Sequence, residues 1–162
     1  MARKPAAVAA FVERFAGDLE AAGIPRLPAR VFVTLLATDD GYLSAAQLAE
    51  RLHISPAAVS GAIRYLVQVQ LVRKEREPGS RRDRYLVTDD SWFEAAVHRA
   101  PMLEQWIRTL TAGEQALGRG TPAGARMHET LAFIEFLHAE MPALLAKWRR
   151  RQGARRRERQ RP

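Results

Sequence analysis

The chain has 162 residues, which is enough for one compact domain or for a small domain with appended helices. It contains no cysteine, which excludes disulfide bonds, thiolate metal sites and a cysteine nucleophile, and no apolar run approaches the length of a membrane span. The first residues mix charged and apolar side chains, unlike a signal peptide, so we expect a cytoplasmic protein with no membrane partner.

The net charge of +8 is distributed unevenly along the chain. Residues 1–42 are neutral, residues 43–88 carry +4, residues 89–146 carry −4, and residues 147–162 carry +8. Positive charge gathered in two segments, with an acidic segment between them, favours a nucleic-acid partner more than the total charge does.

The N-terminal third predicts two helices and a short strand. Apolar residues at helical spacing predict a helix over residues 5–22, which Gly23 ends. Residues 24–28 contain two prolines and form a constrained connector, and residues 29–38 are apolar enough for a buried helix. After the turn at residues 39–41, Tyr42-Leu43 is expected to form the first strand of a small sheet.

A helix-turn-helix is predicted over residues 44–68. Ser44 caps a first short helix, His53-Ile54 makes the turn, and Ser55 caps a second helix whose first position is Pro56. Apolar residues at helical spacing face inward in the second helix (Val59, Ile63, Leu66 and Val67). The outer face is mostly small, so a partner can approach closely; its residues are Ala57, Ala58, Ser60, Gly61, Arg64 and Tyr65.

A basic hairpin follows directly. Residues 71–77 and 81–88 read as two strands, joined by the turn Pro78-Gly79-Ser80. Three arginines are therefore expected at or near the tip, where they suit phosphate contact or insertion into a minor groove: Arg81, Arg82 and Arg84. The alternative is a solvated hairpin whose charges only protect an edge strand from aggregation. Because the helix pair lies directly upstream, we favour a DNA-binding wing.

The C-terminal half predicts further helices. Asp89-Asp90-Ser91 marks a helix start, Pro101 should interrupt that helix, and a last helix is expected from about residue 125 to 150, kinked at Pro142. These helices and the first one carry more apolar surface than a small core needs (Phe11, Phe15, Leu131, Ile134 and Leu145), which favours a homodimer. The alternative is that they fold back on their own DNA module.

Other candidate sites are weaker. Trp92, Trp106 and Phe133 could line a cavity for a small-molecule effector, although such aromatics more often form core. The four histidines lack metal-ligand spacing, and no catalytic motif stands out, so we expect no cofactor, no metal and no enzyme. The arginine-rich residues 151–162 should be disordered, adding non-specific DNA affinity without sequence choice.

This order of elements resembles the MarR superfamily of bacterial transcription regulators. Residues 23–27, 78–83 and 140–148 look most like its GbsR-type branch, and the resemblance spans about residues 8–148. It implies a homodimeric repressor or activator with the second helix of the motif in the major groove. It also implies that Asp83 pairs with a neighbouring arginine to hold the wing, which would be Arg81, Arg82 or Arg84.

The sequence therefore predicts a mainly α protein with a small β-wing (α+β), a winged helix-turn-helix flanked by long dimerisation helices. Its expected parts are an N-terminal helix (1–28), the DNA-binding domain (29–88), C-terminal helices (89–150) and the tail (151–162). The predicted function is sequence-specific binding of duplex DNA. The residues expected to contact the bases in the major groove are Ser55, Ala57, Ala58, Ser60, Gly61 and Arg64. The alternatives are a winged-helix scaffold for protein interaction and an RNA-binding protein acting through the basic tail.

Overall fold

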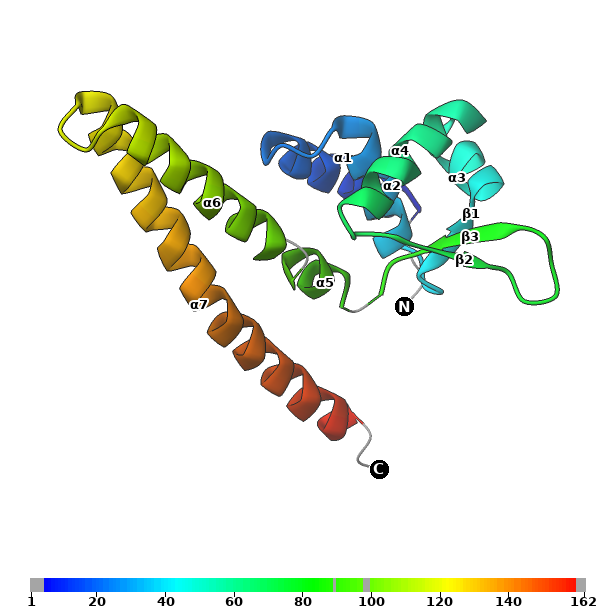
Figure 1. Cartoon of the computed structure of the whole chain (residues 1–162). Coiled ribbons are helices and arrows are strands. Elements are labelled where there is room, and N and C mark those ends of the chain that lie inside the picture. The colour runs from blue at the N-terminus through cyan, green and yellow to red at the C-terminus, as the bar shows by residue number, and fades with distance from the viewer. Residues whose placement is uncertain (1–4, 89, 98–99, 160–162) are drawn as a thin grey trace. The chain divides into compact units, whose positions relative to one another are not determined.

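The computed structural model describes residues 5–88, 90–97 and 100–159, which form helices and one small sheet (Figure 1). The chain divides into two units, one up to Ala95 and one from Ala96, and each is described by itself. The elements in chain order are α1 (Pro5–Ala21), α2 (Arg26–Leu36), β1 (Tyr42–Ser44), α3 (Ala45–Leu52), α4 (Pro56–Gln68), β2 (Arg73–Arg76), β3 (Asp83–Leu86), α5 (Ser91–Val97), α6 (Ala100–Leu117) and α7 (Pro122–Arg159).

The core of the first unit is built around α2. Its Val31, Phe32, Val33 and Leu35 are fully buried, because α1, α3 and α4 all pack against this helix. Ala16 of α1 and other apolar residues meet them there: Leu48, Val59 and Leu66. Burying each such side chain contributes roughly 1.5–3 kcal/mol to folding. The buried helix that the sequence predicted is therefore the support on which the helix-turn-helix rests.

The start of α2 differs from the sequence-based prediction. The connector expected over residues 24–28 is shorter, since Pro25 already occupies the N-cap and the helix begins at Arg26. Pro28 then lies in the first turn, where a missing N–H removes no intrahelical hydrogen bond. Proline was read as a sign of the connector, whereas here it is part of the helix.

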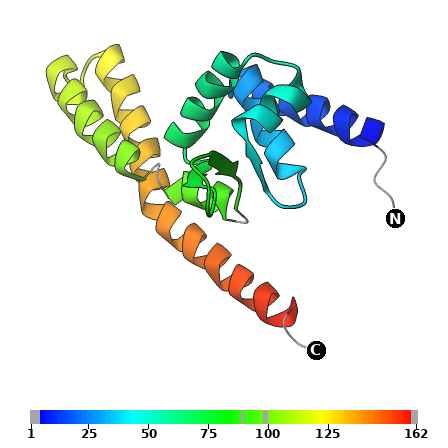
Figure 2. The same ribbon diagram turned by 90° about the vertical axis from the view of Figure 1, so that its right-hand side faces the viewer.

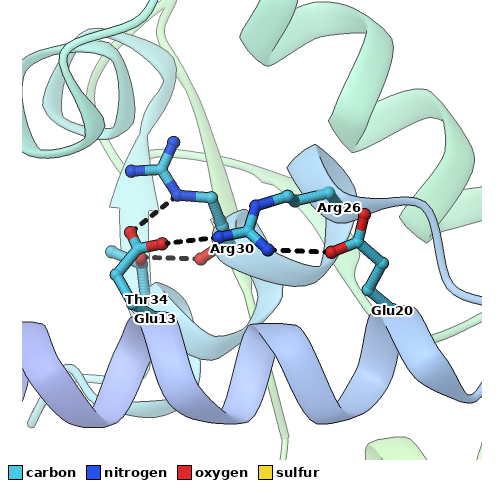
Figure 3. A network of polar contacts seen from close by, with 5 residues as sticks. All are labelled: Glu13, Glu20, Arg26, Arg30 and Thr34. Atoms are coloured by element: carbon cyan, nitrogen blue, oxygen red, sulfur yellow. Dashed lines mark hydrogen bonds and ion pairs between the residues drawn. The ribbon is translucent and has the colours of Figure 1, made fainter.

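A network of ion pairs fixes α2 against α1 (Figure 3). Arg26 donates to Glu20 at 2.8 Å and to Glu13 at 3.4 Å, and Arg30 Nε donates to Glu13 at 2.8 Å. Thr34 Oγ1 turns back to donate to the carbonyl of Arg30 at 2.7 Å. Both carboxylates come from α1 and both guanidiniums from α2, so the network joins the two helices at their exposed edge.

The sheet has the strand order β1-β3-β2 and is antiparallel throughout. Leu43 pairs with Tyr85, which in turn pairs with Lys74 on the other side. The first strand was predicted correctly, but β2 and β3 are each four residues long and shorter than the predicted ranges. Figure 2 shows the same elements turned by 90°.

The second unit is a helical hairpin in which α6 and α7 lie side by side (Figure 1). Leu103 of α6 is buried with Leu131 and Ile134 of α7. Pro101 lies in the first turn of α6, which begins at Ala100, whereas the predicted interruption before it falls on residues 98–99, outside the described residues. Helix α7 has 38 residues and α6 has 18, so the C-terminal part of α7 extends beyond the part that packs against α6.

The prediction of a disordered tail is wrong for residues 151–159, because α7 continues to Arg159; residues 160–162 of the predicted tail lie outside the described residues. Arginine is a good helix former, and extending an existing helix avoids the cost of nucleating one. The helix also continues through Pro142, which costs one backbone hydrogen bond. No helix among the described residues is long and apolar enough to span a bilayer.

Candidate nucleic-acid interface

The first helix of the predicted motif starts with a complete capping box. Ser44 Oγ accepts a hydrogen bond from the backbone N–H of Gln47 at 3.2 Å, and Gln47 Oε1 accepts one from the N–H of Ser44 at 2.8 Å. Two N–H groups that a helix start leaves without partners are thereby satisfied. Since Ser44 is also the last residue of β1, the cap ties α3 to the sheet.

The turn between α3 and α4 depends on one residue in the left-handed region. His53 has φ 52° and ψ 49°, and its N–H closes the end of α3 on the carbonyl of Glu50. Ile54 is half-buried beneath the turn, and Ser55 Oγ accepts from the N–H of Ala58 at 3.2 Å, with Pro56 at the first helical position. The predicted turn, cap and start of the second helix are all confirmed.

Helix α4 presents one buried and one open face. Val59, Ile63 and Leu66 are buried, as predicted. Most of the predicted contact residues are exposed (Ser55, Ala57, Ser60, Gly61 and Arg64), and Ala58 is half-buried. A Cβ placed on Gly61 would meet nothing within 4 Å. The exposed residues that were predicted to contact DNA therefore lie on one accessible surface of α4. Arg64, with its guanidinium, is the last of them along the helix.

The turn of the wing is held by hydrogen bonds to the backbone. Glu77 and Arg82 close the hairpin through an N–H···O bond of 2.9 Å, and the N–H of Arg82 binds Ser80 Oγ at 3.1 Å. Gly79 has φ +73°, a conformation that favours glycine. The side chains of Arg81 and Arg82 are exposed beside this turn, where the sequence predicted them.

Arg84 lies near the wing tip, but in a strand and not beside the turn with Arg81 and Arg82. Arg84 lies within β3 between Ser44 of β1 and Glu75 of β2, because β3 is the central strand. Its guanidinium lies over the ring of Tyr42, 4.7 Å from the centroid, and donates to Glu75 Oε2 at 3.1 Å. Its half-buried side chain therefore links all three strands. The hydrophobic and charge patterns gave no hint of the role of Tyr42, since it depends on strand register.

The implied pairing of Asp83 is also corrected. Its partner is not Arg81, Arg82 or Arg84 but Lys74, whose Nζ lies 2.8 Å from Asp83 Oδ2 across the hairpin. The hydrogen bond to Asp83 raises the pKa of Lys74, and the attraction between the two charges acts in the same direction. The carboxylate still holds the wing, but it does so by joining β3 to β2.

The three aromatic residues proposed for an effector cavity do not share one unit. Trp92 packs edge-on against Phe32, with ring centroids 5.3 Å apart, whereas Trp106 and Phe133 are exposed on the helical hairpin. A cavity of about 640 Å³ lies instead in the first unit, between α1, α2 and the end of α3. Within residues 5–88, 90–97 and 100–159, no group of three side chains suitable for a metal comes together.

Two family models match the chain. The model of the MarR family matches residues 22–83, and that of MmpR5-like MarR family transcriptional regulators matches residues 90–151. The HTH-type transcriptional regulator MmpR5 of Mycobacterium tuberculosis (strain ATCC 25618 / H37Rv) is 26% identical over 129 residues, which are 77% of this chain and 78% of that protein.

Solved structures also match this chain, and the first of them is similar to it in fold. The crystal structure of a transcriptional regulator has a TM-score of 0.79 at 22% identity, covering 88% of this chain and 98% of its own. Sco3205, a MarR family transcriptional regulator from Streptomyces coelicolor in complex with DNA, covers 82% of this chain and 79% of its own at 24% identity, with a TM-score of 0.43. One family model matches the helix-turn-helix and another the closing helices, so both parts of this chain are similar to MarR family transcriptional regulators.

Proposed function

We propose that this protein is a MarR-type transcriptional regulator that binds duplex DNA sequence-specifically, with α4 in the major groove. The carrying observation is the exposed face of α4, where small residues surround Arg64 and nothing fills the space at Gly61. A groove about 12 Å wide admits a helix, and small side chains let its backbone approach the bases. Arg64 can then donate two hydrogen bonds to a guanine, the commonest specific contact.

The wing supplies phosphate contacts in this proposal. Arg81 and Arg82 are exposed next to a turn that is held by the Ser80 hydroxyl, so their backbone is fixed before DNA arrives. We assign Arg84 a different part, that of holding the wing through Tyr42 and Glu75. Phosphate contacts position the protein, whereas base contacts carry the sequence preference.

A homodimer is part of the proposal, but its predicted surface needs revision. Leu131 and Ile134 are buried within the second unit and are not available to a partner. Large apolar side chains remain exposed elsewhere on α7: Phe133 at 59%, Phe136 at 59%, Leu144 at 64% and Trp148 at 39%. Phe11 of α1 is 47% exposed. A two-fold dimer covers such surfaces and presents two copies of α4 to a palindromic site.

Three finer predictions stay predictions. They are the GbsR-type branch, a small-molecule effector and a cytoplasmic location. No observation favours the scaffold or the RNA-binding alternative over duplex DNA. The test is selection of bound sequences from a random duplex library, followed by gel shifts of the selected duplex against random duplex DNA and duplex RNA. We expect the selection to enrich a palindromic sequence, and random DNA should compete poorly with this duplex for the protein. Equal binding of all three probes would contradict sequence-specific recognition.

A further inference from the structure

The C-terminal part of α7 is a basic helix with almost no apolar side chains. Residues 147–159 (the basic segment) contain eight lysine and arginine residues and one acidic residue, Glu158. After Trp148, the only aliphatic residue in this segment is Ala154. The side chains of several of these cations are exposed: Lys147, Arg150, Arg151, Arg155 and Arg157.

This helix repels itself. Lys147 and Arg151, and likewise Arg151 and Arg155, are four residues apart and so lie above one another on the helix surface. Like charges at this spacing destabilise a helix, although cations near its C-terminus interact well with the helix dipole. A polyanion would remove the repulsion and keep the favourable dipole interaction.

The distribution of charge around the helix indicates which kind of polyanion the basic segment binds. Successive residues of a helix are about 100° apart, so Lys147, Arg149, Arg150 and Arg151 place cations on every side of the helix. A helix that lies on a membrane needs an apolar face, which this segment lacks. A helix in a duplex groove has a phosphate strand on each side, so cations on opposite sides all find partners.

We propose that the basic segment is a second duplex-binding element, which contacts the DNA backbone separately from α4 and the wing. This inference rests on the proposed function and extends it, because the segment adds affinity that does not depend on sequence. Each phosphate that is neutralised on B-DNA changes the slope of log affinity against log salt by about 0.9.

The test uses the full chain and a random-sequence duplex of 30 base pairs, with anisotropy measured across a salt series. One variant replaces Arg150, Arg151, Arg155 and Arg157 with glutamine, and a matched control replaces the same four with lysine. In the glutamine variant, we expect the slope of log affinity against log salt to be smaller in magnitude by about 2–4. Its affinity at low salt should be at least tenfold lower. The lysine control should keep the slope of the wild type.

A second pair of variants tests the helix itself at constant charge. Ala154→Pro should kink the basic segment and reduce the salt slope, whereas Ala154→Gln should not. Circular dichroism of the wild type should gain helical signal when the duplex is added. An unchanged slope in the glutamine or the proline variant overturns the proposal, as does a loss seen with duplex RNA but not with duplex DNA. If the wild type binds no duplex at all, the proposed function fails as well.

Discussion

Arg84 lies over the ring of Tyr42, with its guanidinium carbon 4.7 Å from the ring centroid, and the two residues come from neighbouring strands. The same guanidinium pairs with Glu75 on the third strand. Cation–π contacts at such sites contribute about 0.5–1 kcal/mol, and an ion pair of this exposure contributes less than about 1 kcal/mol. One side chain therefore joins all three strands of the sheet.

Arg84→Gln should loosen the wing. We expect a loss of about 1 kcal/mol of stability, together with weaker binding to every duplex, because the hairpin that carries Arg81 and Arg82 is then held less firmly to β1 and β2. Thermal unfolding and anisotropy measure the two effects. Arg81→Gln is the control, since its exposed side chain should affect binding without affecting stability; equal melting temperatures for Arg84→Gln and wild type would contradict the role given to Arg84.

Replacing Arg64 or Arg82 with alanine should affect DNA binding in different ways. Arg64→Ala should reduce discrimination between the selected site and scrambled DNA by roughly 1–3 kcal/mol, because a bidentate base contact is lost. Arg82→Ala should weaken binding to both duplexes alike and reduce the salt slope by about 1. Competition binding with the two duplexes distinguishes them. Equal losses on both duplexes for Arg64→Ala would show that Arg64 does not read the sequence.

Sequence reasoning went furthest where local rules determine structure. The caps Ser44 and Ser55 and the inward face of α4 followed from spacing and hydrogen-bonding capacity alone. The contacts of Arg84 and Asp83 did not, because they depend on which residues stand opposite one another in the sheet. The helical state of residues 151–159 was missed because composition signals disorder, whereas a helix already formed upstream extends easily.

Leu144→Glu should weaken self-association. Leu144 is 64% exposed on α7, and a carboxylate there would be buried without a partner in the proposed dimer. Light scattering at tens of micromolar, a generous concentration for association, should show a dimer for wild type and a monomer for the variant. Ala139→Glu is the matched control, because Ala139 is exposed on a different side of the same helix. A wild type that is only monomeric would contradict the dimer.

Glu114 should make the helical hairpin sensitive to acid. Its Oε1 accepts hydrogen bonds from Arg119 Nε at 2.6 Å and from His128 Nδ1 at 2.8 Å. The bond from Arg119 lowers the pKa of Glu114 below its usual 4.5. A carboxyl whose pKa is lower in the folded state stabilises the fold above its unfolded pKa, and this contribution is lost as the pH falls.

Melting curves between pH 7 and pH 3 test the contribution of Glu114. The melting temperature of wild type should fall as the pH drops below the usual carboxyl pKa. Glu114→Gln should have a lower melting temperature than wild type at pH 7, and its melting temperature should depend less on pH. Glu129→Gln serves as the control, since Glu129 is an exposed carboxylate on α7. The same pH dependence in wild type and Glu114→Gln would rule out this role for Glu114.

The placement of α4 in the groove is tested most directly by adding a carboxylate at Gly61. Nothing lies within 4 Å of a Cβ at Gly61 or at Gly17 of α1, so Gly61→Glu and Gly17→Glu should both fold and should gain stability from replacing a helical glycine. Binding of both proteins to the selected duplex is then measured by anisotropy at one salt concentration. We predict that Gly61→Glu abolishes binding, because its carboxylate would face the bases and phosphates, while Gly17→Glu binds like wild type. Binding by Gly61→Glu within a factor of two or so of its control, a difference worth less than about 0.5 kcal/mol, would contradict the account.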